Sequence, residues 1–285
     1  AVVGPSPTAD LLDQAWADLS ARALKFRESD YIRSLRATAF GNLVRNGRIP
    51  LAVAPARTLF DLPADPGPDA AGTTSGIFPA LREAVENARR EVIIVSPYLV
   101  PGEKGLGVLC EMARRGVRVR ILTNSLASTD VPVVHAGYAR YRPRLLACGV
   151  ALHELRPATD VARRTRIGLS SGASLHSKAI VVDGETVFIG SMNLDPRSRN
   201  LNTEVALQIG SPELGAQLTR LFDEAATLDQ AFRPVLDESG NADASLHWDA
   251  IENDQPVRYA DEPLAGAWRL WMTRLLWVLA PETML

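Results

Sequence analysis

Residues 174–193 read Ser-Leu-His-Ser-Lys-Ala-Ile-Val-Val-Asp-Gly-Glu-Thr-Val-Phe-Ile-Gly-Ser-Met-Asn, and this stretch predicts a β-hairpin. Leu175 to Val182 is rich in β-branched and apolar residues, as strands are. Asp183-Gly184 is a strong hairpin turn signal. Thr186 to Ile189 is a second short apolar run, which completes the hairpin.

Four polar side chains give this hairpin a chemical character. We expect His176 and Lys178 on one face of the first strand, because strand residues two apart share a face. Ser191 and Asn193 follow the second strand and add a hydroxyl and an amide. A lysine is a point charge suited to phosphate. A histidine loses its proton near neutral pH, so it can serve as nucleophile or general acid. Each residue alone fits an ordinary polar hairpin, but together they predict a catalytic site in which Lys178, Ser191 and Asn193 hold phosphate oxygens.

Two carboxylates accompany this group. Glu204 follows the hairpin, and we expect it to orient and polarise His176 from behind, as acids behind catalytic histidines do; the alternative is a carboxylate at a strand edge. Asp183 lies in the turn, where aspartate is favoured for local reasons. We expect a structural or network role for Asp183, because the turn is at the far end of the strand from His176.

Three further side chains follow the ends of predicted strands. Ligands gather at strand ends in open α/β sheets. Tyr98 ends an apolar strand, Asn124 begins the loop after the next strand, and that loop leads to His135. We expect all three to line the pocket, although a lone histidine is more often structural.

Helices and strands alternate through the second half of the chain. Such alternation predicts a layered α/β fold with helices on both faces of the sheet. A small β extension is expected after Ala231. The expected helices are 78–90, 106–115, 133–148 and 213–228, and the expected strands are 51–55, 91–98, 117–123, 150–155 and 204–209.

The beginning of the chain resembles a later segment. Residues 1–20 and 206–226 share a strand, a glycine, an x-Pro turn and a helix, which indicates an internal repeat; a coincidental strand-turn-helix is the alternative. We therefore expect a first hairpin of the same kind upstream of Ala1. The predicted organisation is the tail of a first half at 1–60, a Pro/Gly-rich linker at 61–75, the second half at 76–231 and a C-terminal extension at 232–285.

Composition limits the class of protein. The chain has 285 residues, 46% of them hydrophobic and 22% charged, which is ordinary for a globular protein. A net charge of −2 argues against a protein that binds nucleic acid by neutralising many phosphates. Cys110 and Cys148 lie in apolar helical contexts, and we expect both to be buried free thiols. The first residues are not a signal peptide and include no initiator Met, so we expect a fragment or a processed product, and the internal repeat favours a fragment.

The last predicted helix, Leu264 to Leu279, is rich in tryptophan and arginine. Trp268, Trp271 and Trp277 are typical of a membrane interface, and arginine favours anionic headgroups. The run is too short for a confident membrane span. We expect interfacial contact or packing on the core, and the two can hold on opposite faces.

The hairpin matches a known pattern. His-x-Lys, Asp five residues after the Lys, and Gly-Ser-x-Asn resemble the motif of the phospholipase D superfamily at His176, Lys178, Asp183, Gly190-Ser191 and Asn193. The runs 122–130, 134–141 and 198–204 and the C-terminal end resemble bacterial cardiolipin synthases of the type C branch. The resemblance implies a phospholipase D-like α/β/α sandwich with a parallel or mixed sheet. Such enzymes carry two His-x-Lys motifs and this chain shows one, so a missing N-terminal half or a second copy is implied.

The resemblance also implies a chemistry. One histidine attacks the phosphodiester and forms a phosphohistidine, and the other protonates the leaving alcohol; we expect His176 to be the general acid and base. The implied substrates are phosphatidylglycerol and a second phospholipid, such as phosphatidylethanolamine, at a bacterial membrane surface, with the cytoplasmic face preferred. No metal and no other cofactor is implied, because lysines supply the positive charge.

Two other functions remain open. One is a phosphodiesterase or nuclease of the same superfamily that acts as a homodimer, against which the near-neutral charge and the C-terminal helix weigh. The other is a catalytically silent half that binds lipid or a partner.

Overall fold

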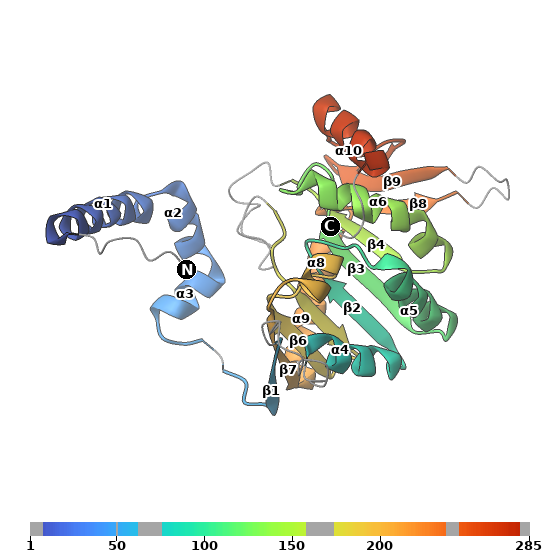
Figure 1. Ribbon diagram of the computed structural model, residues 1–285, viewed down its shortest axis with the longest axis horizontal. Helices are drawn as coiled ribbons and strands as arrows, with labels where there is room; N and C mark the ends of the chain where they lie inside the picture. The colour runs from blue at the N-terminus through green and yellow to red at the C-terminus, as the bar shows by residue number, and fades with distance from the viewer. Residues whose placement is uncertain (1–7, 50, 62–75, 158–173, 238–244, 280–285) are drawn as a thin grey trace. The chain divides into compact units, whose positions relative to one another are not determined.

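The computed structural model describes residues 8–49, 51–61, 76–157, 174–237 and 245–279 (Figure 1). These residues fall into two compact units that divide between Leu51 and Ala52. The short apolar run expected at the very start of the chain and most of the expected linker lie outside the described residues.

The first unit is helical. It contains α1 (Ala9–Arg27), α2 (Asp30–Ala37) and α3 (Ala39–Arg45). Threonines begin two of these helices: the Thr8 hydroxyl accepts a hydrogen bond from the backbone N–H of Leu11 at 3.4 Å, and the Thr38 hydroxyl accepts one from Gly41 at 2.9 Å. The helix expected within residues 1–20 is therefore confirmed, and it continues to Arg27, about two turns further.

The second unit is built on a ten-stranded mixed sheet in the order β1-β7-β6-β5-β2-β3-β4-β8-β9-β10 (Figure 1). The three central strands β2, β3 and β4 are parallel to one another, and the pairings on either side are antiparallel. The strands are β1 (Ala56–Phe60), β2 (Glu91–Val95), β3 (Arg118–Asn124), β4 (Ala151–Leu155), β5 (Ala179–Val182), β6 (Thr186–Gly190), β7 (Val205–Gly210), β8 (Ala231–Leu236), β9 (Leu246–Glu252) and β10 (Gln255–Tyr259).

Helices cover both faces of this sheet, which confirms the layered α/β prediction. Alternate residues of β2 point to opposite faces: Val92 and Ile94 pack in the core beneath α4, α5 and α6, whereas Ile93 and Val95 pack in the core beneath α9. The helices of this unit are α4 (Ile77–Glu86), α5 (Gly102–Arg114), α6 (Pro132–Ala147), α8 (Pro196–Asn200), α9 (Pro212–Ala225) and α10 (Ala267–Leu279).

Three expectations about strands need correction. No strand forms at 51–55; β1 begins at Ala56, because there it can pair antiparallel with β7, with Ala56 opposite Ile209. The first hairpin strand begins at Ala179, so His176 and Lys178 lie in the segment that leads into it. The expected C-terminal β extension is present as β8 to β10, but β8 pairs with β4, so it continues the main sheet.

The two cysteines also differ from expectation. Cys110 and Cys148 are joined in a disulfide and are only partly buried, so they are not buried free thiols. The reason is tertiary: α5 and α6 pack side by side, and Cys148 caps α6, so two residues separated by 38 positions come within 5.3 Å between their Cα atoms. Sequence context around each cysteine could not show that these helices are neighbours.

Candidate active site

The turn of the motif hairpin is tied to the beginning of β2. Asp183 has a positive φ of 54°, and its carboxylate accepts hydrogen bonds from the backbone N–H groups of Arg90 at 2.7 Å and Glu91 at 3.0 Å, and also from Arg89. Burial alone would raise the pKa of Asp183, but the hydrogen bonds from Glu91, Arg90 and Arg89 outweigh it and lower the pKa. These contacts are those of a structural residue at the far end of the hairpin strand from His176.

The other end of the hairpin is held by Asn124, at the end of β3. Its amide donates to the carbonyl of Leu175 at 3.2 Å, and its Oδ1 accepts from the N–H of Leu175 at 2.9 Å. Asn124 is buried and also contacts Ser174 and Ser128. The predicted pocket residue Asn124 therefore fixes the backbone immediately before His176.

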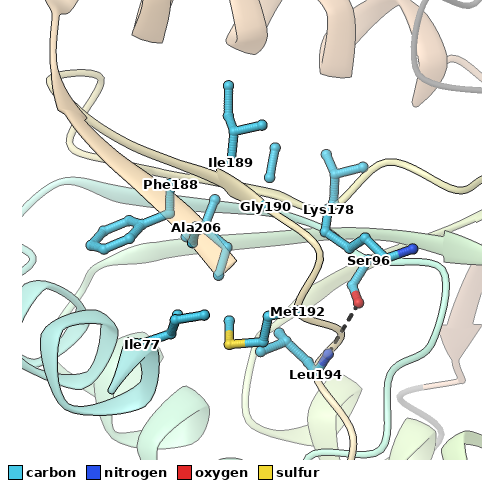
Figure 2. Close-up of a pocket in the computed structure, with 12 residues that line it drawn as sticks. Ile77, Ser96, Lys178, Phe188, Ile189, Gly190, Met192, Leu194 and Ala206 are labelled. Atoms are coloured by element: carbon cyan, nitrogen blue, oxygen red, sulfur yellow. Dashed lines mark hydrogen bonds between the residues drawn. The ribbon is translucent and has the colours of Figure 1, made fainter. Parts of the chain in front are cut away.

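Lys178 is half-buried and follows at the open end of the hairpin. Its Nζ donates to the backbone carbonyl of His176 at 2.8 Å. Burial lowers the pKa of Lys178, and the carboxylates of Glu204, Asp130 and Asp195 act against that shift. Lys178 also lies beside a pocket with mostly apolar walls (Figure 2); the walls include Ile77, Phe188, Met192, Leu194 and Ala206.

The imidazole of His176 is exposed, and it has no hydrogen-bond partner in the part of the chain that the structure describes. The backbone of His176 lies one residue after Leu175, which Asn124 holds, and its carbonyl accepts the hydrogen bond from Lys178. The ring is therefore accessible to a substrate.

Glu204 lies behind Ser191. The hydroxyl of Ser191 donates to one oxygen of the Glu204 carboxylate, and the side-chain amide of Asn202 donates to the other at 3.1 Å. Glu204 is buried, with 6% of its surface exposed. These two bonds occupy the carboxylate, and the predicted orientation of His176 by Glu204 stays a prediction.

Asn193 is the least satisfied polar residue of the site. Its backbone N–H donates to the Ser198 hydroxyl at 3.3 Å, but within the described residues its side-chain amide has no hydrogen-bond partner, and Oδ1 is buried. Buried amides are normally paired. The amide is thus held in position by its backbone while its side chain is left for another group.

Gly190 is required by close packing in the same turn. A Cβ at this position would come within 2.2 Å of the carbonyl oxygen of Val205 on the neighbouring strand β7. Glycine in a strand often marks such an approach of two backbones. The approach brings Ser191, directly after Gly190, against Glu204.

Tyr98 lies near the end of β2, as predicted for a pocket residue. Its hydroxyl donates to the two carboxylate oxygens of Asp130, at 2.9 and 3.0 Å. Burial raises the pKa of Tyr98 to about 12, and Asp130 and Asp195 add to the shift. The segment is joined to the motif turn through Ser96, whose Oγ donates to the carbonyl of Tyr98 and accepts from the N–H of Leu194 (Figure 2).

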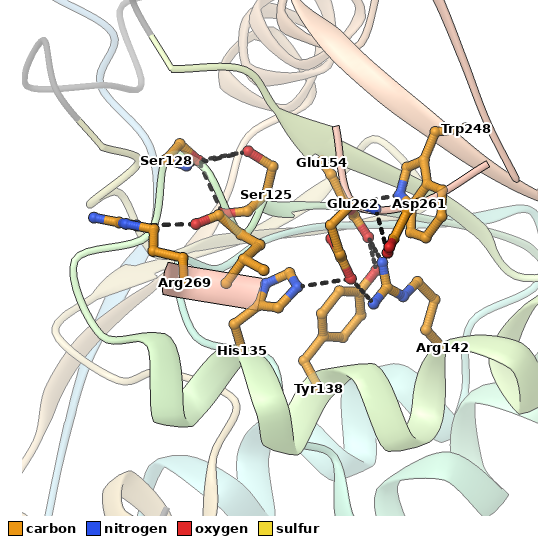
Figure 3. A network of polar contacts seen from close by, with 11 residues as sticks. Ser125, Ser128, His135, Tyr138, Arg142, Glu154, Trp248, Asp261, Glu262 and Arg269 are labelled. Atoms are coloured by element: carbon orange, nitrogen blue, oxygen red, sulfur yellow. Dashed lines mark hydrogen bonds and ion pairs between the residues drawn. The ribbon is translucent and has the colours of Figure 1, made fainter. Parts of the chain in front are cut away.

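His135, the third predicted pocket residue, faces a different cluster. It is buried on α6, with Nε2 3.4 Å from a carboxylate oxygen of Glu262 (Figure 3). Glu262 also binds Arg142, whose other amino group binds Glu154. His135 therefore lies at the edge of a buried charge network that joins α6, β4 and the segment before α10.

Two acidic residues of the site were not predicted. Asp130 holds Tyr98, and Asp195 caps α8 by accepting from the N–H of Ser198 at 2.7 Å. Burial raises the pKa of Asp195, and neighbouring Glu204 adds to the rise. The sequence Asp195-Pro-x-Ser contains a helix-start signal that could have located Asp195; no local signal marks Asp130.

The assembled residues suit an oxyanion. The segments that carry a cation, an amide without a partner and an exposed imidazole lie at one end of the hairpin, where Lys178, Met192 and Leu194 line one pocket. Cations and N–H donors are the groups that stabilise an oxyanion. Among the described residues, no group of three or more histidine, cysteine, aspartate or glutamate side chains is arranged to hold a metal ion.

Comparison with known proteins gives a consistent picture. A family model described as "Cardiolipin synthase, PLD-like domain" matches residues 81–226. Cardiolipin synthase C of Escherichia coli (strain K12) is 38% identical over 258 residues, which cover 90% of this chain and 53% of that protein. Cardiolipin synthase A of Erwinia tasmaniensis is 34% identical over 148 residues, 52% of this chain and 27% of that protein. The chain thus spans about half the length of the first of these relatives, and less of the second.

The solved structures that align with this chain have low sequence identity to it. Nuc, a phospholipase D family member from Salmonella typhimurium, has a TM-score of 0.45 at 18% identity, over 64% of this chain and 98% of that one. Phosphatidylserine synthase from Haemophilus influenzae has a TM-score of 0.46 at 16% identity, over 65% of this chain and 43% of that one.

Proposed function

Because the chain belongs to the family of cardiolipin synthase PLD-like domains, we propose that it forms part of the active site of a phosphatidyltransferase that makes cardiolipin. The observation that carries the proposal is that the Asn193 side chain has no hydrogen-bond partner among the described residues, in a turn that begins against Lys178: the Gly190 N–H donates to the Lys178 carbonyl at 3.3 Å. The Lys178 ammonium and the Nδ2 of Asn193 can each donate to a phosphoryl oxygen.

In the first proposed step, a histidine from a second motif attacks the phosphorus of a phospholipid. The bond from phosphorus to the leaving alcohol breaks, and His176 gives its proton to the alcohol oxygen; with phosphatidylglycerol as donor, the alcohol is glycerol. The negative charge that develops on the phosphoryl oxygens is stabilised by Lys178 and Asn193, and Ser191 contributes only if its hydroxyl exchanges its hydrogen bond to Glu204 for one to the substrate. The product of this step is a phosphatidyl-histidine.

In the second step, the hydroxyl of phosphatidylglycerol replaces the histidine. His176, now neutral, takes the proton of that hydroxyl, the new bond from oxygen to phosphorus forms, and the bond from phosphorus to the histidine nitrogen breaks. The product is cardiolipin, and both histidines return to their starting states. Phosphatidylethanolamine is a second candidate donor, with ethanolamine as the leaving alcohol.

The second histidine has to come from an N-terminal half or from a second copy of the chain. The first curated relative is about twice as long as the matched region, which supports the N-terminal half. The apolar walls of the pocket beside Lys178 support transfer over hydrolysis, since a site that excludes water protects the intermediate.

We also propose a peripheral position at the membrane. On α10, Trp268 and Trp271 stack with ring centroids 5.2 Å apart and are 68% and 57% exposed, whereas Thr273 is buried. One face of α10 thus packs on the protein and the other offers tryptophans, which favour the membrane interface. No helix among the described residues has the length and hydropathy to cross a bilayer.

The redox state of the two cysteines indicates on which side of the membrane the protein lies. We proposed the cytoplasmic face from the sequence, but a Cys110–Cys148 disulfide persists in oxidising compartments. Alkylation of intact cells with a mass-tagged maleimide, before and after reduction, decides between the two. Free thiols in the cell would support a location on the cytoplasmic face. An intact disulfide in the cell would contradict that location.

The activity is tested with vesicles of phosphatidylglycerol, by mass spectrometry of the lipid products. We expect cardiolipin and glycerol, and His176→Ala should lower the rate by roughly 10²–10⁴-fold without changing the unfolding midpoint. Phosphatidic acid in place of cardiolipin would indicate hydrolysis. Cleavage of DNA with no lipid product would favour the nuclease, and vesicle binding without any product would favour the silent half. Full activity of His176→Ala would exclude the proposed role of this histidine.

A further inference from the structure

Arg269 of α10 binds the loop between β3 and α6. Its Nη1 donates to the carbonyl of Leu126 at 2.9 Å and to the carbonyl of Thr129 at 2.8 Å. Charged donors to carbonyl oxygens form strong hydrogen bonds, and a planar guanidinium holds two acceptors in a fixed geometry. The side chain comes from more than a hundred residues away in sequence, so it is a tertiary clamp on this loop.

The residue after the clamped loop contacts the candidate active site. Asp130 directly follows Thr129, and both of its carboxylate oxygens accept from the hydroxyl of Tyr98. Tyr98 in turn lies in the segment that Ser96 joins to the motif turn. A continuous series of contacts therefore leads from α10 through the loop to the site.

Three carboxylates act on Lys178, and they are held in different ways. Glu204 is fixed by Ser191 and Asn202, and Asp195 is fixed at the beginning of α8 by Ser198. Asp130 has Tyr98 as a partner, and its place on the chain is set by the loop that Arg269 clamps.

We propose that Arg269 is a positioning residue for the phosphate site: by holding the carbonyls of Leu126 and Thr129, it places Asp130 against Tyr98, whose segment is joined to the motif turn. That the position of Asp130 matters for turnover rests on the proposed function. That Arg269 sets this position does not. The competing explanation is that Arg269 only attaches α10 to the protein.

The test follows the reactivity of Lys178, because an unprotonated amine reacts with acetic anhydride and an ammonium does not. The sequence has three lysines, Lys25, Lys104 and Lys178, so mass spectrometry resolves each of them. Lys104 is exposed and serves as the internal reference. The charged groups around Lys178 are Asp130, Asp195 and Glu204, with His176 on its own segment. Loss of a nearby carboxylate lowers the pKa of a lysine, so its labelling at neutral pH becomes faster.

We expect Arg269→Gln to raise the labelling of Lys178 relative to Lys104 roughly two- to fivefold at pH 7. Asp130→Asn should do the same, and the double variant should match Asp130→Asn alone, because Arg269 acts through Asp130. Arg269→Lys, which keeps a charged donor on a shorter side chain, should lie between wild type and Arg269→Gln. The matched control is Arg258→Gln, which removes an exposed arginine paired with Asp249 and should leave the ratio unchanged.

The two explanations give different results. A wild-type labelling ratio in folded Arg269→Gln, or effects of Arg269→Gln and Asp130→Asn that add in the double variant, would overturn the proposal. If Arg269→Gln does not fold, Arg269→Lys decides by the same ratio. Labelling needs no turnover, so the expected ratios together with no lipid activity in a protein that contains both histidine motifs would uphold the positioning role and reject the proposed function instead.

Discussion

Two polar clusters in the same unit differ in how their charges are compensated. In the buried network, Arg142 lies 3.0 Å from a carboxylate oxygen of Glu154 and 2.5 Å from one of Glu262, and the Trp248 indole also donates to Glu154 (Figure 3). In the candidate active site, the hydrogen-bond partner of the Lys178 ammonium is the carbonyl of a neighbouring residue, and the amide of Asn193 has no partner among the described residues.

The difference indicates which cluster stabilises the fold and which one is available to a ligand. Burial raises the pKa of Glu154, and would raise that of Glu262 as well, but Arg142 and His135 outweigh it and lower the pKa of Glu262. Such a network is held together by its own members, so it joins elements of the fold. The network also contains buried atoms without a partner among the described residues, Arg142 Nε and Glu262 Oε2, but its cation binds two carboxylates, whereas the Lys178 ammonium binds a carbonyl. Changes in the first cluster should therefore affect stability, and changes in the second should affect activity.

The largest expected effect is on Arg142. Arg142→Met leaves Glu154 buried without its cation, and we expect a loss of about 3–5 kcal/mol in the free energy of unfolding, measured by urea denaturation. The double variant Arg142→Met/Glu154→Leu should recover part of this loss, because it removes the uncompensated carboxylate. A single variant as stable as wild type would show that the network does not hold these elements together.

The next effect is on Lys178. Lys178→Met keeps the length of the side chain and removes the charge, so we expect kcat for lipid transfer to fall roughly 10²–10³-fold with an unchanged unfolding midpoint. Lys104→Met is the matched control and should retain full activity, since Lys104 is exposed on α5. Equal losses in the two variants would mean that the effect is not specific to the site.

Asn193 should show a smaller and opposite effect on stability. Asn193→Leu replaces an unpaired buried amide with an apolar side chain of similar size, so we expect the free energy of unfolding to stay the same or rise by up to about 1 kcal/mol. Lipid transfer should fall, because a phosphoryl oxygen loses a donor. A clear loss of stability would mean that the amide is paired in the folded protein and would remove the main support for the site.

The smallest effect concerns Asp183 and pH. The pKa of Asp183 is lower in the folded protein, so its ionised form contributes stability above the unfolded-state pKa of about 4, and this contribution is lost as pH falls through the folded-state pKa. Asp183→Asn removes it. Thermal melts between pH 2 and 6 should show a weaker pH dependence in the variant, and identical slopes would contradict the structural role.

The hairpin and the layered fold could be predicted because both have local signals. The turn Asp183-Gly184 marks the hairpin, and the alternation of helices and strands predicts layers. The spacing of the motif also predicted that His176, Lys178, Ser191 and Asn193 would meet, and the structure brings their segments together at the open end of the hairpin.

The remaining features depend on contacts between distant parts of the chain. The Cys110–Cys148 disulfide requires that α5 and α6 be neighbours, and the contact of Arg269 with the loop before Asp130 requires the position of α10. The strand at 56–60 was misplaced because its partner β7 selects the register. Neither periodicity nor turn signals carry information on such pairings.

The central claim is that the unpaired cluster at Lys178 and Asn193 receives a phosphate group. Competitive acetylation of the three lysines with and without inorganic phosphate tests this directly, with sodium sulfate at equal ionic strength and sodium chloride as references. We predict that phosphate slows the labelling of Lys178 in a saturable manner, leaves Lys104 unchanged, and loses this effect in Asn193→Leu. The account would be contradicted if phosphate did not change the labelling of Lys178, or if phosphate slowed the labelling of Lys104 equally.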